Sequence, residues 1–135
     1  MLIPSISFTG NCDEAIEFYK NAVGADVLEV YRFRDAPPDH GMDENTPPDF
    51  VMHAELIIFG TKVIMSDGGT VPPNTNDSFY FTLFLDTDED VVKTFNGLAD
   101  GGKVLEPLAP QFFASMHGFA EDKFGVGWSI NAKSS

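Results

Sequence analysis

His53 and Glu55 are the two residues of this chain whose types and spacing could do chemistry. They stand two positions apart in the segment 51–67, VMHAELIIFGTKVIMSD. Residues two apart on an extended strand project from the same face, and strand rise separates them by about 6–7 Å. An imidazole and a carboxylate placed in this way could polarise a substrate or exchange protons with it. The same pair could instead be a hydrogen-bonded polar pair on a hydrated sheet face.

The segment that carries this pair predicts two strands joined by a tight turn. Gly60-Thr61 is a two-residue loop with glycine first, which suits a type II′ hairpin and would place Phe59 opposite Lys62. One face of the hairpin is purely apolar, and we expect it to pack on a helix. Its members are Met52, Ala54, Leu56, Ile58, Val63 and Met65. The other face is mixed and could hold a site. It carries Val51, His53, Glu55, Ile57, Phe59, Lys62, Ile64 and Ser66.

Other candidates are spread along the chain. His117 could face a binding cleft or be a structural residue of a Phe-rich strand. His40 lies in an acidic loop, where it could be a lid contact or a solvent-exposed surface residue. Tyr80 and Phe113 could line a cleft or pack in the core. Cys12 stands at the start of a predicted helix, where the helix dipole lowers a thiol pKa. Because no basic partner is near it in sequence, we interpret Cys12 as inert.

Composition and charge exclude several classes of function. The chain has 135 residues, of which 43% are apolar, so we expect one domain with its own core. Its net charge is −13 with only eight Lys and Arg, which argues against nucleic acid or an anionic membrane as a partner. The single cysteine excludes an internal disulfide and fits a reducing compartment. With no signal-peptide pattern and no long apolar run, we expect a cytoplasmic protein.

The first half of the chain predicts a strand, a helix and three further strands. A strand at 3–8 precedes a helix at 11–25, in which Asn11 and Glu14 resemble a capping box. An apolar stripe of Ile16, Tyr19 and Val23 marks the buried face of this helix, and Gly24 ends it. A strand at 26–33 and an acidic loop at 34–50 lead into the hairpin, after which Asp67 is expected to cap a turn.

The second half repeats this order. A strand at 79–86 leads to a helix capped by Thr87 with Asp90, whose stripe Val92, Phe95 and Ala99 lies 76 positions after the first stripe. Strands at 104–106, 112–121 and 126–131 follow. The order predicts an α+β fold of two βαβββ modules, with curved mixed sheets around a cleft and helices on the outer face. We place the modules at about 1–69 and 78–133 of a single domain, 1–135.

This layout resembles the vicinal oxygen chelate superfamily, which contains glyoxalase I, bleomycin-resistance proteins and extradiol dioxygenases. Within that superfamily, several stretches resemble the PhnB-like group. They are SFTGNCDEAIEFY near the start, the loop beginning FRDAPP, VMHAEL with MSD in the hairpin, and DKFGVGWSIN near the end. Members of the superfamily often pair, and open sheet edges need covering, so we also expect a homodimer.

The resemblance implies a divalent metal held by one ligand from each of four strands. The four positions fall near Ile3, Ile64, Tyr80 and at Ser129 in this sequence. Isoleucine offers no donor atom, serine is a poor ligand and tyrosine an occasional one. Shifting to the neighbouring Ser5, Thr82 or Asn131 does not restore the set. We therefore predict that the usual metal ligands are absent, and a non-standard site at His53 and Glu55 would need a third ligand.

Two hypotheses of function follow. The first is a protein that binds a small organic molecule in its sheet cleft without the usual metal, as bleomycin-resistance proteins bind a cationic drug. The acidic charge favours a cationic ligand, and the expected contact residues are Tyr80, Phe113, His117 and Ser129. The second is a lyase- or isomerase-type enzyme that uses His53 and Glu55 as catalytic residues, with or without a divalent metal.

Overall fold

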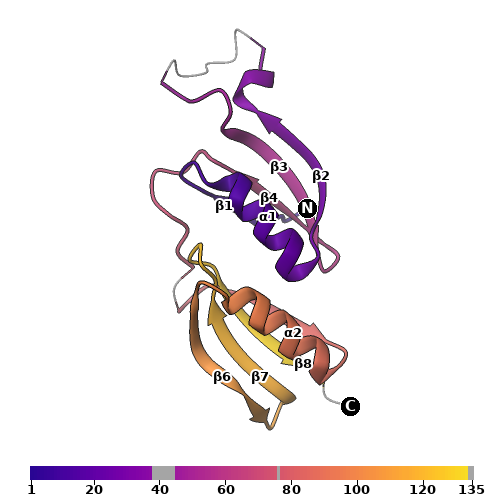
Figure 1. Cartoon of the computed structure of the whole chain (residues 1–135). Helices are drawn as coiled ribbons and strands as arrows, with labels where there is room; N and C mark the ends of the chain where they lie inside the picture. Colours follow the sequence, from indigo (N-terminus) through magenta and orange to yellow (C-terminus); the bar gives the residue numbers. More distant parts are fainter. Residues whose placement is uncertain (38–44, 76, 134–135) are drawn as a thin grey trace. The chain divides into compact units, whose positions relative to one another are not determined.

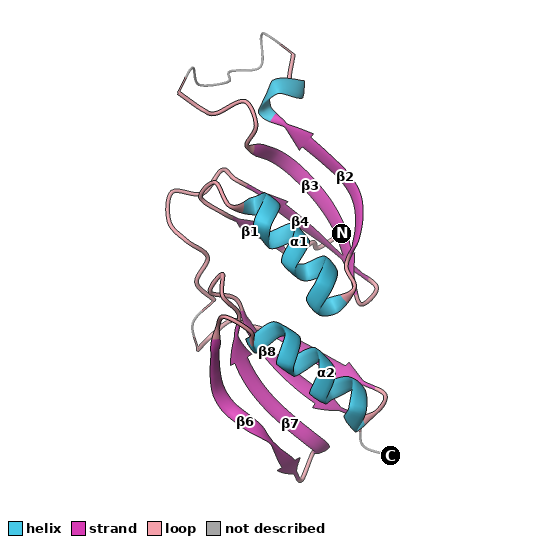
Figure 2. Cartoon of the chain, viewed as in Figure 1, coloured by secondary structure: helices cyan, strands magenta, loops and turns pink. Residues whose placement is uncertain are grey.

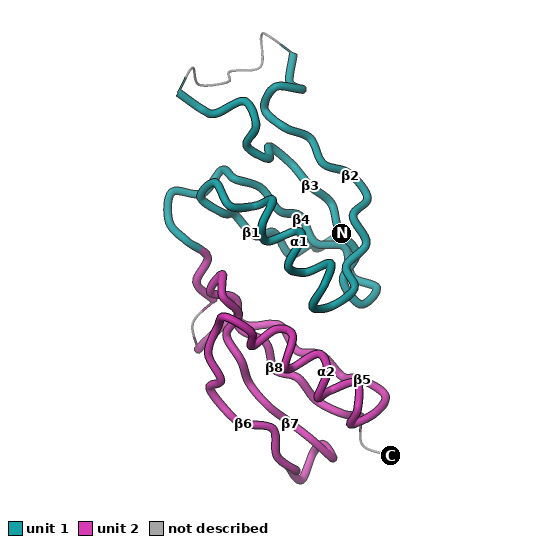
Figure 3. The backbone as a smooth tube through the Cα atoms, viewed as in Figure 1, with its two compact units in different colours: residues 1–72 teal, residues 73–135 magenta. Residues whose placement is uncertain are grey.

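The computed structural model describes residues 1–37, 45–75 and 77–133, which form two compact units, Met1–Pro72 and Pro73–Ser135 (Figure 3). The first unit contains β1 (Ser5–Ser7), α1 (Cys12–Val23), β2 (Asp26–Arg32), a short 3₁₀ helix (Phe33–Asp35), β3 (Val51–Ile58) and β4 (Thr61–Ser66). The second contains β5 (Phe81–Leu85), α2 (Asp88–Ala99), β6 (Lys103–Gln111), β7 (Ala114–Glu121) and β8 (Gly127–Ala132) (Figure 1). The predicted α+β class with two βαβββ modules is confirmed.

The two units have the same sheet topology. Their strand orders are β1-β4-β3-β2 and β5-β8-β7-β6. In each sheet the first strand pairs parallel with the last, while the remaining pairs are antiparallel, so both sheets are mixed. One helix covers one face of each sheet (Figure 2). Helix α2 begins and ends 76 positions after α1 does, which is the offset expected from the sequence.

The β3–β4 hairpin differs from the expected turn by one residue. Ile58 pairs with Thr61, so the turn residues are Phe59 and Gly60, with φ of 47° and 81°. Two positive φ values define a type I′ turn, and the predicted type II′ turn at Gly60-Thr61 is wrong. Phe59 adopts the left-handed region without being a glycine, which sequence rules disfavour.

This correction leaves the two faces of the hairpin unchanged. Lys62 pairs with Ile57 and not with Phe59, which is a shift of two residues along β3. Because side chains alternate between the two faces of a strand, a shift of two residues keeps each side chain on the same face. The expected apolar face is buried at Ala54, Leu56, Ile58, Val63 and Met65. Its outer member Met52 is 37% exposed, whereas Val51 is fully buried although we assigned it to the mixed face. The register of β2 against β3 shifts near Val51, which accounts for that difference.

Helix α2 is rotated by about one position relative to the predicted stripe. Its buried residues are Val91, Thr94, Phe95 and Leu98, while Val92 is 38% exposed. The ring of Phe95 lies over Gly118 of β7, where a Cβ atom would come within 2.7 Å of it. This close approach fixes the rotation of the helix. The predicted cap is present, because the Thr87 hydroxyl accepts from the Asp90 N–H.

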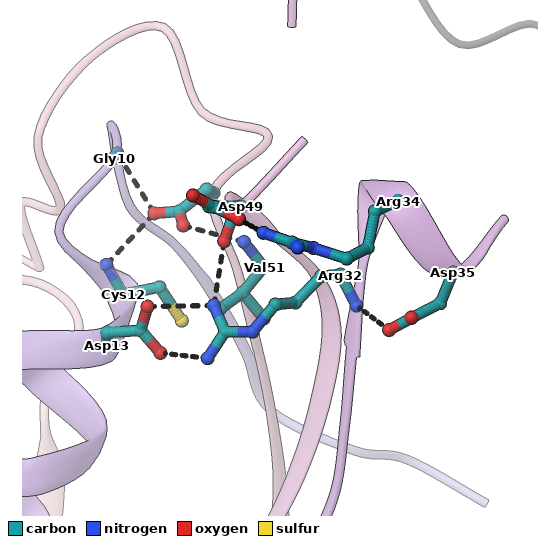
Figure 4. A network of polar contacts seen from close by, with 9 residues as sticks. Gly10, Cys12, Asp13, Arg32, Arg34, Asp35, Asp49 and Val51 are labelled. Atoms are coloured by element: carbon teal, nitrogen blue, oxygen red, sulfur yellow. Dashed lines mark hydrogen bonds and ion pairs between the residues drawn. The ribbon is translucent and has the colours of Figure 1, made fainter. Parts of the chain in front are cut away.

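Asp67 fastens the start of α1 to the central hairpin. Its Oδ1 accepts hydrogen bonds from the N–H groups of Gly10 and Cys12, each at 2.9 Å, and its Oδ2 accepts from Val51 N–H at 2.9 Å (Figure 4). The predicted capping box at Asn11 is wrong, because the Asn11 side chain makes no capping hydrogen bond. Asp67 is only 7% exposed, so one buried carboxylate orients three donors from two separate segments.

Arg32 joins the end of β2 to both α1 and the chain that returns to β3. Its guanidinium donates to both carboxylate oxygens of Asp13, at 2.8 and 2.9 Å, and to the Asp49 carbonyl at 2.7 Å (Figure 4). The hydrogen bond to Asp13 raises the pKa of Arg32. Arg34 pairs with the Asp49 carboxylate, and Asp35 accepts from the Arg32 N–H. The base of the acidic loop is therefore tied down at both ends, and His40 lies outside the described residues.

Removing the Asp67 carboxylate should destabilise the first module. Asp67→Ala leaves three N–H groups without their acceptor, and each unsatisfied buried donor costs about 1–3 kcal/mol. We expect urea-induced unfolding to report a loss of about 3 kcal/mol or more. Asp35→Ala is the control, since it removes one exposed hydrogen bond and should cost about 1 kcal/mol or less. Equal losses in the two variants would contradict the anchoring role of Asp67.

Candidate functional site

The open face of the first sheet carries His53 and Glu55, as predicted. The His53 Nε2 lies 3.9 Å from the Glu55 Oε1, and the Lys62 Nζ lies 3.4 Å from the same oxygen. Glu29 is the cross-strand neighbour of Glu55. A hydrogen bond with the Glu29 side chain is the main cause that lowers the pKa of Glu55, and the Lys62 charge adds to it while burial opposes. Glu55 is therefore a carboxylate at neutral pH and acts as an acceptor.

Tyr31 completes this cluster. It is paired with His53 across β2 and β3, and the two rings lie 6.5 Å apart with a 34° tilt. The Tyr31 side chain was not singled out from the sequence, because recognising it requires the register between two strands that are separated by the acidic loop. The side chains of His53 and Glu55 are 39% and 20% exposed, so both are accessible to a ligand.

His117 in the second module is held from both sides of its ring. Its Nδ1 lies 2.5 Å from the Asn131 Oδ1, and its Nε2 lies 3.0 Å from the Glu106 Oε2. The Asn131 amide nitrogen donates to the Leu83 carbonyl at 3.2 Å and to the Ser129 hydroxyl at 3.1 Å. The side chain of His117 is 12% exposed and that of Glu106 is 64% exposed, so the chain of contacts runs from the core to the surface.

A groove of about 680 Å³ opens beside this ring. It is lined by Glu106, Pro107, Ala109, Gln111, Phe113 and His117. The rings of Phe113 and His117 meet edge to face, with centroids 5.2 Å apart. The structure thus brings two of the predicted contact residues, Phe113 and His117, to one groove.

The other two predicted contact residues do not line this groove. Tyr80 is 44% exposed and packs edge to face on Phe119, with ring centroids 4.9 Å apart. Ser129 is 7% exposed, and its hydroxyl accepts from Asn131. Sequence reasoning did not assign Glu106 a role. Asn131 was considered only as an alternative to Ser129 at the fourth metal-ligand position. Because the two residues are two apart on one strand, this spacing could have indicated that Asn131 faces the same side of the sheet as Ser129.

The two histidines occupy equivalent positions in the two modules. Across the first sheet, Glu29 pairs with Glu55 and Glu55 pairs with Ile64. Across the second sheet, the matching row runs through Glu106, Phe119 and Ser129. His53 stands two residues before Glu55 on β3, and His117 stands two residues before Phe119 on β7. Each module therefore places an imidazole next to a glutamate-bearing row on the same sheet face.

The positions that correspond to the metal ligands of the superfamily do not fit a divalent ion. Ile64 is opposite Ser5, and Ser129 is opposite Thr82, so each pair of strands offers at most hydroxyl groups there. Among the residues that the structure describes, no three His, Cys, Asp or Glu side chains gather closely enough to hold a metal. The chemistry of these donors gives no basis for a step through a metal ion.

Cys12 is buried at the start of α1. Burial is the largest cause that raises its thiol pKa to about 12, and the negative charges of Asp67 and Asp13 add to the rise while Arg32 opposes it. These effects outweigh the helix dipole, which would lower the pKa. The thiol stays protonated at neutral pH, which supports its interpretation as inert.

Two βαβββ modules, each with a mixed sheet covered by one helix and an open face that carries a histidine, define the class of this protein. A sequence model of the Glyoxalase/Bleomycin resistance protein/Dioxygenase superfamily matches residues 4–130. The chain belongs to this superfamily, and within it to the PhnB-like group. No helix in the described part of the chain is long and apolar enough to cross a membrane.

Three similar proteins support this placement. Protein YjdN of Escherichia coli is 36% identical over 139 residues, which cover 96% of this chain and 93% of that protein. The crystal structure of protein PA1353 from Pseudomonas aeruginosa matches with a TM-score of 0.83 at 30% identity, covering 100% of this chain and 98% of that one. A PhnB protein from Bacillus cereus matches with a TM-score of 0.75 at 25% identity, covering 97% and 98%.

Proposed function

We propose that this protein binds a small organic cation with an aromatic or apolar body, in the groove of the second module. The observation that carries the proposal is the groove itself, which combines an exposed carboxylate with an aromatic wall. Glu106 supplies the negative charge, and Phe113, 43% exposed, supplies the ring. Such a groove can hold a charged head group and an apolar body at the same time.

Coulomb attraction and cation–π contact in the groove both favour a cationic ligand over an anionic one. A cation gains Coulomb attraction from Glu106, and it gains further if it lies over an aromatic face such as that of Phe113. The net charge of −13 raises the local concentration of cations and lowers that of anions around the whole molecule. Burial of apolar ligand surface against Pro107 and Ala109 adds about 25 cal/mol per Å².

Charge selectivity tests this proposal directly. Tryptamine, a cation at neutral pH, and indole-3-propionate, an anion of similar shape, should be titrated into the protein by isothermal calorimetry. We expect the cation to bind at least about tenfold more tightly, which corresponds to about 1.4 kcal/mol. Added salt should weaken its binding because the attraction is electrostatic.

Variants of residues inside and outside the groove test whether the cation binds there. Phe113→Ala and Glu106→Gln should each weaken tryptamine binding about tenfold. The matched controls are Phe112→Ala, whose side chain is 99% exposed and does not line the groove, and Glu17→Gln on α1. Equal affinity in all four variants would show that the cation responds only to the overall charge, and the proposal would fail.

An enzyme that uses His53 and Glu55 is the second candidate function. The observation in its favour is the Glu55 carboxylate, which is ionised and lies within 3.9 Å of His53 and 3.4 Å of Lys62. This arrangement could accept a proton from a substrate bound on the open face of the first sheet. It would need a further ligand to hold a metal ion.

Metal addition tests the metal-dependent form of the second candidate. A metal bound only to the folded state raises the melting temperature by mass action. If the first proposal holds, zinc, nickel and manganese should leave the melting temperature unchanged, and elemental analysis should find no stoichiometric metal. His117→Ala is the control for His53→Ala, because the two histidines occupy equivalent positions. Stoichiometric metal that is lost in His53→Ala and kept in His117→Ala would favour the enzyme instead.

We further propose that the protein works in the cytoplasm as a homodimer. The free thiol of Cys12 fits a reducing compartment. Strands β2 and β6 each end a sheet, and they expose Val27 and Leu28, and Val104 and Leu105, which a second copy could cover. Sedimentation equilibrium should give twice the chain mass, and a monomer at micromolar concentration would contradict this assembly.

A further inference from the structure

The geometry around His117 points to a chemical class of ligand. We propose that the groove of the second module selects organic ammonium ions that carry N–H groups, and that such a ligand replaces a proton shared by His117 and Glu106. This inference rests on the proposed function, because it concerns the same groove. It adds a specific requirement, namely that the cationic head group must donate hydrogen bonds.

The hydrogen bonds of Asn131 fix the orientation of its amide. Its amide nitrogen donates to the Leu83 carbonyl and to the Ser129 hydroxyl, at 3.2 and 3.1 Å. The Leu83 carbonyl can only accept, so this contact fixes which end of the amide is the nitrogen, and the Ser129 hydroxyl is compatible with it. The oxygen therefore faces His117, and it can only accept. The Nδ1 of His117, 2.5 Å away, must carry a hydrogen atom.

The other ring nitrogen of His117 faces Glu106. Because Nδ1 is protonated, the Nε2 of a neutral ring presents a lone pair. It lies 3.0 Å from the Glu106 Oε2, which is also an acceptor when the carboxylate is ionised. Two acceptors that face each other repel, unless one of them carries a proton or a third group donates a hydrogen bond to both. A proton on Nε2 would meet this need and make an imidazolium–carboxylate pair.

An ammonium head group can meet the same need. A primary ammonium has three N–H donors, so it can donate to Nε2 and to the Glu106 carboxylate together. The binding step balances as follows: the ammonium enters with its positive charge, His117 becomes neutral, and the proton that leaves Nε2 passes to solvent. A quaternary ammonium has the same charge but no N–H, so it cannot satisfy the two acceptors and leaves the proton in place.

The residues around the His117 ring support the replacement of its Nε2 proton by an ammonium group. Glu106 from β6 is the one carboxylate among the residues that line the groove. Strand β8 contributes the uncharged Asn131 and Ser129, and β7 turns Gly118 toward α2. In the first module, by contrast, His53 lies 3.9 Å from Glu55, which is too far for a hydrogen bond. The requirement for a donor is specific to the second module.

Nuclear magnetic resonance of the ring nitrogens tests the tautomer of His117 without any ligand. At a pH high enough for neutral imidazole, the ¹⁵N shifts of His117 should show a protonated Nδ1 and a bare Nε2. Asn131→Leu removes the acceptor and should shift the ring toward the opposite tautomer. A wild-type ring protonated at Nε2 instead would overturn the inference.

Two probes of equal charge test the ligand class. Tryptamine should bind at least about tenfold more tightly than its N,N,N-trimethyl derivative, and Glu106→Gln should abolish this preference. Because Glu106 is exposed, this variant is expected to fold, and Glu17→Gln is the control for the lost charge. Calorimetry in buffers of different ionisation enthalpy, at a pH where imidazole is charged, should report release approaching one proton per tryptamine and none for the trimethyl derivative.

The outcomes separate this inference from the proposed function. If both probes bind equally tightly, or if tryptamine binds without proton release, the inference fails while binding of cations in the groove stands. If neither probe binds, both the proposed function and the inference fail. A preference for tryptamine that survives in Glu106→Gln would also overturn the inference, because the second acceptor would then have no part in it.

Discussion

One buried carboxylate holds the first module in register. Asp67 follows β4 in sequence, yet its oxygens accept from the N–H groups of Gly10 and Cys12 at the start of α1 and from that of Val51 at the start of β3. The helix position, the beginning of the hairpin and the end of the hairpin are thereby set by a single side chain. The second module has a comparable centre in Asp122, which is 2% exposed and accepts from Phe124, Val126 and the Trp128 indole.

The two modules also share the placement of one histidine on the third strand of each sheet. Both histidines stand on the sheet face opposite the helix, where the His53 side chain is 39% exposed and that of His117 is 12% exposed. Their surroundings then differ. In the first module His53 lies beside a tyrosine ring and an ionised carboxylate, whereas in the second module His117 lies between an amide oxygen and a carboxylate. The two histidines therefore occupy equivalent backbone positions but have different contact partners.

The sequence was sufficient for the features that depend on local periodicity. Alternation in the hairpin assigned the two faces correctly except at its first residues, Val51 and Met52, and the spacing of apolar residues found both helices. It failed where a distant partner decides the outcome. Asn11 has the local pattern of a cap, but the oxygen that accepts from the Cys12 N–H is Oδ1 of Asp67, 55 positions away. The turn moved by one residue because Phe59 adopts positive φ. Glu106 and Asn131 became site residues only through strand register, which no local pattern encodes.

The equivalence of the two sheets has a consequence for how such proteins diversify. The carboxylates that secure each module bind backbone and core groups, and they are not among the residues of the groove. Substitutions along the open rows can therefore change recognition while the scaffold keeps its anchors. A duplicated module of this kind offers two independent surfaces for divergence, so that a lineage could alter the chemistry of one half while the other half preserves its own.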